Sequence, residues 1–142
     1  MEVPQPGTPE WHALVREDVV EPGRAIIDPH HHLWPSGQAL NYDIADLLGD
    51  TGDGHNIECT VFMECGASYD TSAPPHLAAV GETRFVADRA TSDPRRTIRA
   101  LVASADLSHP QLDEILDAHT EASAGMFRGI RDALSRADEP EA

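Results

Sequence analysis

The sequence predicts an α/β protein with a parallel sheet, because three patterns agree. Short runs rich in β-branched residues alternate with segments of helical apolar spacing, in the order β, α, β, α, β, α, β. The loops between them are short, and strands that alternate with helices pair in parallel through right-handed crossovers. Two architectures satisfy this order: an open doubly wound sheet, and half of a (β/α) barrel.

The first half of the chain contains the clearest predicted strand. Residues 1–24 are predicted to be an extended, proline-rich lead-in with one short helix around residues 11–17. A first strand over residues 25–27 enters Asp28, and a short helix covers residues 42–48 after a turn-rich stretch. The next strand covers residues 57–65. Alternation places Cys59, Val61 and Met63 on one side of it and Thr60, Phe62 and Glu64 on the other.

The second half repeats the alternation. The Pro74-Pro75 pair predicts the first turn of a helix that continues through Ala90. A third strand covers residues 98–105. Ser108-His109-Pro110-Gln111 is typical of a capping box before a helix whose apolar stripe is Leu112, Ile115, Leu116 and His119. Gly125 ends that helix, a fourth strand covers residues 126–131, and residues 137–142 are a frayed acidic tail. Residues 25–136 thus form one unit.

Charge and hydropathy exclude several classes of function. The chain has 10 arginines, no lysine and 25 acidic residues, which gives a formal net charge of −15. Nucleic acids and anionic membrane surfaces both select basic proteins, so neither is expected as a partner. The apolar runs are shorter than the ~18 residues of a membrane span. The polar N-terminus lacks the features of a signal peptide, so the predicted localisation is cytoplasmic.

Two cysteines are expected to be free thiols. Cys59 and Cys65 lie on one predicted strand, where six residues span about 20 Å. A disulfide requires Cα atoms within ~7 Å. Cys65 has no evident activating base nearby in the sequence, which argues against a nucleophilic role.

The densest chemical signal is Asp28-Pro29-His30-His31-His32-Leu33-Trp34, directly after the first strand. Side chains at i and i+2 of an extended backbone point the same way, so His30 and His32 share a face and His31 points away. Two imidazoles on one face suit a divalent cation. Asp28 shares that face and is expected to orient one ligand imidazole by accepting its N–H. The simpler alternative is a solvated histidine loop.

This motif resembles the amidohydrolase superfamily, and in particular its amidohydrolase-related branch, which includes sugar-lactone and pyrone-dicarboxylate lactonases. Phe127-Arg128-Gly129-Ile130-Arg131 is similar to the Gly-Ile-Arg segment of that branch's fourth strand. Val61-Phe62-Met63-Glu64 and Gly81-Glu82-Thr83-Arg84-Phe85 match its second strand and second helix. The resemblance covers roughly residues 25–135.

The resemblance implies a TIM-type barrel of which this chain holds only about the first half, four strands, as an N-terminal fragment. His30 and His32 match the metal-binding pair of the first strand. The family's remaining ligands and its general-base Asp belong to later strands, so they are expected beyond residue 142 and no catalytic residue is assigned here. Binuclear members use a carboxylated lysine, and this chain has none. A single divalent metal, zinc, is therefore expected.

Barrel geometry sorts the other polar residues, because loops that follow strands lie on the catalytic side. Glu64 at the end of the second strand, Arg131 at the end of the fourth and Trp34 are the expected substrate contacts. A solvated carboxylate and a surface ion pair are the plainer alternatives for Glu64 and Arg131. His76, Asp106 and His109 fall on the same side. His55 falls on the opposite side, and His119 is expected to be a packed core histidine.

These expectations define a metal-dependent hydrolase that acts on a lactone or a related ester or amide of small-molecule size, incomplete as this chain stands. One alternative is a zinc-dependent decarboxylase of the same superfamily. Another is a non-catalytic half-barrel that binds a cation weakly or pairs with a second copy as a homo-oligomer. A doubly wound nucleotide-binding domain is disfavoured, because no glycine-rich phosphate loop follows the first strand.

Overall fold

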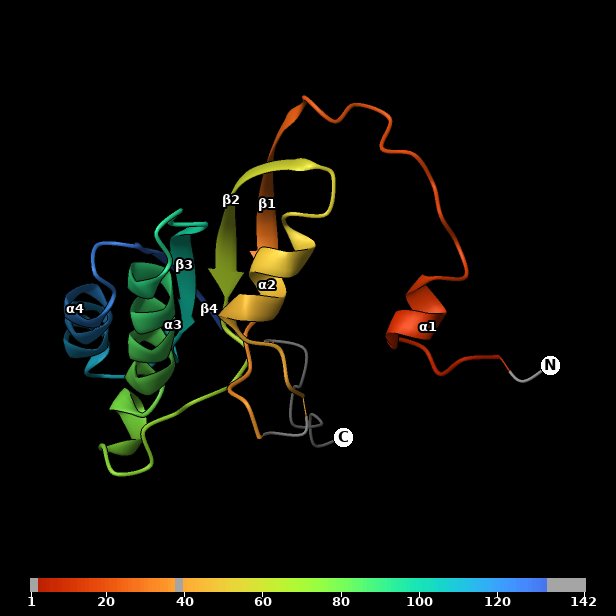
Figure 1. Cartoon of the computed structure of the whole chain (residues 1–142). Coiled ribbons are helices and arrows are strands. Elements are labelled where there is room, and N and C mark those ends of the chain that lie inside the picture. The colour runs from red at the N-terminus through yellow and green to blue at the C-terminus, as the bar shows by residue number, and fades with distance from the viewer. Residues whose placement is uncertain (1–2, 38–39, 133–142) are drawn as a thin grey trace, which may run out of the picture.

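The computed structural model describes residues 3–37 and 40–132. It confirms an α/β fold with one four-stranded parallel sheet. The strands are β1 (Ala25–His31), β2 (Asn56–Met63), β3 (Ile98–Ser104) and β4 (Phe127–Arg131). They pair in sequence order, β1-β2-β3-β4. Figure 1 shows the arrowheads of β2 and β3 at the same edge of the sheet.

Three helices cover one face of the sheet: α2 (Ile44–Asp50), α3 (Val80–Ser92) and α4 (Leu112–Ala122). Strands that are added in sequence order by crossovers of one hand place every connecting helix on the same side. The core lies between this covered face and the helices. Its buried residues are Leu33, Leu47, Phe62, Val86, Ala90, Ile98, Leu101 and Ala103.

The opposite face, here called the open face, carries no helix within the described residues (Figure 1). Its strand positions alternate with those of the core. The register aligns Ile27 with Cys59, Val61 with Ala100, and Met63 with Val102 and Gly129. These positions are apolar. At the last register position the residues are polar instead of apolar, because Ser104 pairs with Arg131. Polar side chains therefore gather at the edge formed by the strand ends.

The N-terminal helix is shorter than the sequence predicts. Helix α1 covers Pro9–His12 rather than residues 11–17, with Thr8 as its N-cap and Pro9 at its first position. It buries no residue, and Figure 1 shows it standing apart from the sheet. A helix without a packed face has little to extend it beyond one turn.

The predicted helix from Pro74 is divided in two. A 3₁₀ turn, η1, covers Pro75–Leu77, and α3 begins only at Val80. The Ala78 carbonyl between them accepts from Asp70 N as well as from Gly81 N. The loop after β2 thus uses a carbonyl that a continuous helix would need.

The predicted capping box before α4 is wrong. Gln111 is the N-cap of α4 and makes no side-chain capping bond. The Ser108 hydroxyl instead donates to Asp106 Oδ1 over 2.6 Å, and the Ser108 N–H donates to the same oxygen. The Asp106 side chain stabilises its own turn, so the helix begins three residues later.

The other boundaries move by a few residues. Helix α2 starts after Asp43, which forms a capping box with Asp46. Gly125 has a φ of +81°, as expected for a residue that ends a helix. The unit predicted over residues 25–136 extends past the last described residue, and the predicted tail lies outside the described residues. Within those residues, none of the helices has the length and apolar character needed to cross a bilayer.

Candidate functional site

The imidazoles of His30 and His32 meet at the end of β1. Their Nε2 atoms lie 3.2 Å apart, and the rings are nearly perpendicular, at 88°. The β1–β2 register shifts between Asp28 and His31, which turns the backbone so that both rings leave the sheet on one side. The sequence prediction that these two histidines share a face is therefore met in the structure.

The main chain determines the tautomer of His32. Its Nδ1 lies 2.8 Å from the Met63 carbonyl oxygen at the end of β2. A carbonyl can only accept, so Nδ1 carries the proton and Nε2 presents a lone pair. The bond between the two rings is then one in which His30 Nε2–H donates to His32 Nε2.

Asp28 and His31 act on the backbone and on the core. The Asp28 carboxylate accepts from the main-chain N–H of His30 over 3.0 Å, whereas the sequence suggested that it would orient an imidazole. His31 points away from the pair, as expected. It is buried against Phe62, and its Nε2 lies 2.9 Å from Thr60 Oγ1. Burial lowers the pKa of His31, which keeps this imidazole neutral.

Trp34 lies beside the histidine pair. Its ring centroid is 5.5 Å from that of His32. An isolated antiparallel bridge to Tyr42 holds its main chain, with Trp34 N donating to the Tyr42 carbonyl over 2.8 Å. The indole is thus placed at the wall of the candidate site by a contact between the segments before and after residues 38–39.

Glu64 and Arg131 are joined to one another. Arg131 Nε donates to Glu64 Oε1 and Arg131 Nη2 donates to the Glu64 carbonyl oxygen, both over 2.6 Å. The Glu64 side chain is only 13% exposed, so it is not a solvated strand end. The sequence named both residues but did not show that they pair. Two bonds from one guanidinium fix its orientation and leave Nη1 unused by Glu64.

Sequence reasoning missed Glu82. It lies on α3 with 2% exposure and accepts from the N–H groups of Cys65 and Ala67, over 3.2 and 2.7 Å. The signal was present, since Glu82 falls at helical spacing with the buried Val86 and Ala90. A carboxylate within an apolar stripe indicates a specific partner.

Cys65 is unsuited to nucleophilic attack. Its Sγ lies 3.5 Å from both Glu82 Oε1 and the Leu33 carbonyl oxygen. Burial, with the Glu82 charge beside it, raises the pKa of Cys65 to about 12. Both cysteines are free, as the sequence predicted.

A second pair of imidazoles lies at the same edge. The His76 and His109 rings are stacked 5.0 Å apart at an interplanar angle of 12°. Rings in parallel planes at this separation do not direct their nitrogens at one ion. His76 Nε2 lies 3.7 Å from Glu114 Oε2. Over residues 3–37 and 40–132, no three His, Cys, Asp or Glu side chains are grouped closely enough to hold a metal ion.

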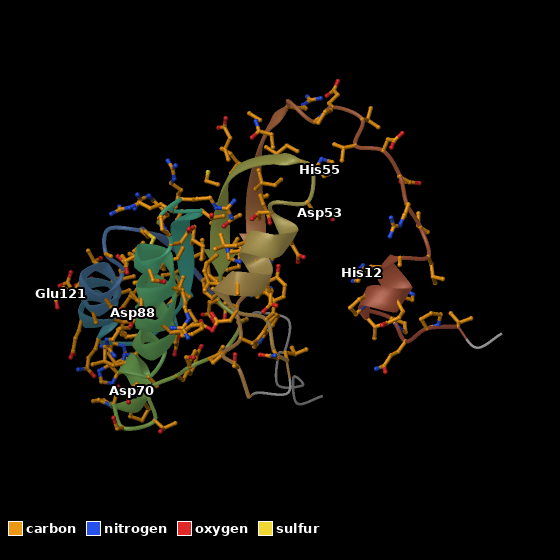
Figure 2. All side chains as sticks on the ribbon, viewed as in Figure 1. His12, Asp53, His55, Asp70, Asp88 and Glu121 are labelled. Atoms are coloured by element: carbon orange, nitrogen blue, oxygen red, sulfur yellow. The ribbon has the colours of Figure 1, made fainter. Side chains whose placement is uncertain are left out.

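The remaining histidines are structural or distant. His119 is fully buried, as predicted, with Nδ1 at 2.8 Å from Thr83 Oγ1 and Nε2 at 3.2 Å from the Ser104 carbonyl oxygen. Figure 2 shows His55 at the edge where β2 begins, away from the strand ends. This position agrees with the predicted separation of His55 from the site.

No protein-family model matches the chain, and no solved structure matches it. The chain is similar to an uncharacterized protein of Sinorhizobium fredii, y4mH, with 30% identity over 132 aligned residues. The alignment covers 78% of this chain and 40% of the relative. The chain thus spans well under half the length of the curated relative that it matches.

Proposed function

We propose that this chain carries part of the active site of a metal-dependent hydrolase of the amidohydrolase type, which acts on a lactone or a related ester or amide. The sheet would be the first half of a (β/α) barrel. Two features support the barrel over a doubly wound sheet. The strands follow sequence order without a reversal, and the three helices share one face.

The observation that carries the proposal is the distance between the two Nε2 atoms. Two nitrogens bound to one tetrahedral zinc at 2.0–2.1 Å are separated by about 3.3 Å. His30 and His32 place theirs at 3.2 Å. His32 already has the tautomer that a metal ligand requires, with its Nδ1–H donated to the Met63 carbonyl.

The fit to a metal is good but partial. His30 would be the second ligand in the tautomer that carries its proton on Nδ1 instead of Nε2. The described residues offer no third donor beside the pair. By the resemblance, the remaining ligands and the general-base Asp would come from later strands outside these 142 residues.

A bound divalent cation would supply a hydroxide-like water near neutral pH and polarise the scissile carbonyl. The residues of this chain would bind and orient the substrate. Arg131, held by Glu64, would direct Nη1, which makes no bond to Glu64, towards an acidic group of the substrate. Trp34 would cover one side of the reacting group next to His32.

Zinc binding by the 142-residue chain tests the proposal directly. Calorimetry should detect one Zn²⁺ per chain in the wild type and none at the same concentration in His30→Ala or His32→Ala. His55→Ala is the matched control, because it removes an imidazole from the opposite edge (Figure 2). Equal binding by all four proteins would overturn the assignment of the site.

Hydrolysis is then measured on a panel of lactones and activated esters. Turnover that disappears in His32→Ala supports a hydrolase. Carbon dioxide release from carboxylated substrates would instead favour the zinc-dependent decarboxylase.

A non-catalytic half-barrel is the second candidate, and the apolar open face is the observation that favours it. Two copies that pair through this face would hide the apolar rows from water. This candidate expects a homodimer in sedimentation experiments, whereas a lack of turnover by the 142-residue chain is expected under both candidates.

A further inference from the structure

Glu82 is a buried acid that the proposed chemistry does not use. Its Oε1 atom accepts from Cys65 N and Ala67 N and lies 3.5 Å from Cys65 Sγ. Among the ion pairs of the described residues, none involves Glu82. Burial raises the pKa of Glu82. An unpaired buried acid weakens a core unless its hydrogen bonds have a particular use.

All three groups near Glu82 Oε1 belong to the segment that follows β2. The neighbouring residue, Gly81, permits the continuation of that segment to pack closely against the helix. A Cβ atom at Gly81 would lie 2.5 Å from both Asp70 N and Ser68 O, so only glycine permits this approach. At the start of α3, Glu82 therefore binds residues 65–67, and Gly81 leaves room for residues 68–70 beside the helix.

The link from Glu82 to the candidate site is a single peptide unit. The carbonyl of Glu64 and the N–H of Cys65 belong to the same planar trans peptide, so they point in opposite directions. Glu82 accepts the N–H on the covered side. The carbonyl on the other side accepts from Arg131 Nη2 over 2.6 Å.

We propose that Glu82 is a positioning residue for Arg131: it holds the Glu64–Cys65 peptide plane, and that plane holds the guanidinium. The inference rests on the proposed function only for the claim that Arg131 meets the substrate. The hydrogen bond to the N–H also polarises the peptide and strengthens its carbonyl as an acceptor for Arg131. The Glu64 side chain provides the second bond, so the guanidinium is held at two points.

The test compares variants at Glu82. Glu82→Gln keeps an Oε1 acceptor and should leave Arg131 in place. Glu82→Met removes the acceptor but keeps a side chain of similar size. Glu82→Asp keeps a carboxylate but shortens the side chain by one methylene, which moves the acceptor away from Cys65. Thr83→Val is the matched control, because it breaks the next buried bond of α3, to His119, without touching residues 64–67.

The readout is the rate at which phenylglyoxal modifies Arg131, followed by peptide mass spectrometry on folded protein. One lost hydrogen bond of typical strength corresponds to about a fivefold faster modification in Glu82→Met. Glu82→Asp should fall between Glu82→Met and the wild type. Glu82→Gln and Thr83→Val should stay within about twofold of the wild type, since neither removes the bond to Cys65.

Unchanged modification of Arg131 in folded Glu82→Met overturns the proposal. If Glu82→Met does not fold, an unchanged rate in Glu82→Asp overturns it. Acceleration in Thr83→Val equal to that in Glu82→Met does so as well, because the effect would then follow stability alone. The measurement needs neither metal nor substrate. A failure to bind zinc therefore counts against the proposed function and leaves this inference standing.

Discussion

Histidine side chains have different surroundings on the two faces of the sheet. On the covered face, His31 and His119 are buried and each bonds a threonine hydroxyl. At the end of the open face, His30 and His32 bond each other, and His30 is exposed. An imidazole whose nitrogens are satisfied by the protein serves the fold. One whose Nε2 meets only another imidazole is available to a ligand.

The faces also differ in packing. Phe62 is 1% exposed within the core, whereas the adjacent Val61 faces the open side and is half-buried. The difference indicates that the covered face supplies most of the buried packing of this chain.

The largest expected effect is the loss of stability when a side chain on the covered face, rather than on the open face, is truncated. Phe62→Ala should lower the free energy of unfolding by about 3–5 kcal/mol, because it removes a fully buried ring. Val61→Ala should cost less than about 1 kcal/mol, since its side chain has no core on its outer side. Urea unfolding at several protein concentrations checks both. A large, concentration-dependent cost for Val61→Ala would show that a second copy covers the open face.

The next largest effect is the difference in stability between replacing a buried histidine and replacing an exposed one. His119→Leu should destabilise the chain by about 2 kcal/mol, because Thr83 Oγ1 and the Ser104 carbonyl lose their partner in the core. His30→Leu should change stability by less than about 0.5 kcal/mol, as is usual for an exposed side chain. Thermal unfolding without added metal is the measurement. Similar costs for both variants would contradict the division between structural and available histidines.

The pH dependence of stability is expected to come from the histidines buried on the covered face. Burial lowers the pKa values of His31 and His119 in the folded chain, while histidines of the unfolded chain have a pKa of about 6.5. The unfolded state therefore binds more protons as the pH falls below that value, and stability falls with it. Burial of Glu82 acts in the opposite sense at lower pH, because its pKa is raised from 4.5.

This prediction is checked by urea unfolding between pH 7.5 and about 5.5, where one such histidine contributes at most about 1.4 kcal/mol per pH unit. The slope should be smaller in His31→Gln than in the wild type. An identical slope in both proteins would show that His31 is not held neutral by the fold.

The smallest effect is kinetic and concerns the thiols. Cys59 lies on the open face, whereas the pKa of Cys65 is raised to about 12. Iodoacetamide at pH 8 should therefore modify Cys59 at least about tenfold faster, because the thiolate is the reactive form. In Cys65→Ser the fast phase should persist, and in Cys59→Ser it should disappear. A fast phase that survives in Cys59→Ser would contradict this order.

Local patterns in the sequence were sufficient for the order of elements and for the histidine pair. Alternation and helical spacing act over a few residues, so they predicted the four strands and their parallel pairing. The i, i+2 rule predicted that His30 and His32 share a face and that His31 does not. The stripe that includes Ile115 predicted the burial of His119.

Only the tertiary structure decided the contacts between distant segments. The division of the Pro74 helix, the Arg131–Glu64 pair and the Glu82 carboxylate all depend on the loop after β2 meeting another element. The contact of the Met63 carbonyl, at the end of β2, with His32 Nδ1 is likewise a contact between distant segments, and it determines the tautomer of His32. These bonds join residues that are 8 to 67 positions apart in the sequence. The periodicity of one segment carries no information about which distant residue will lie beside it in the folded chain.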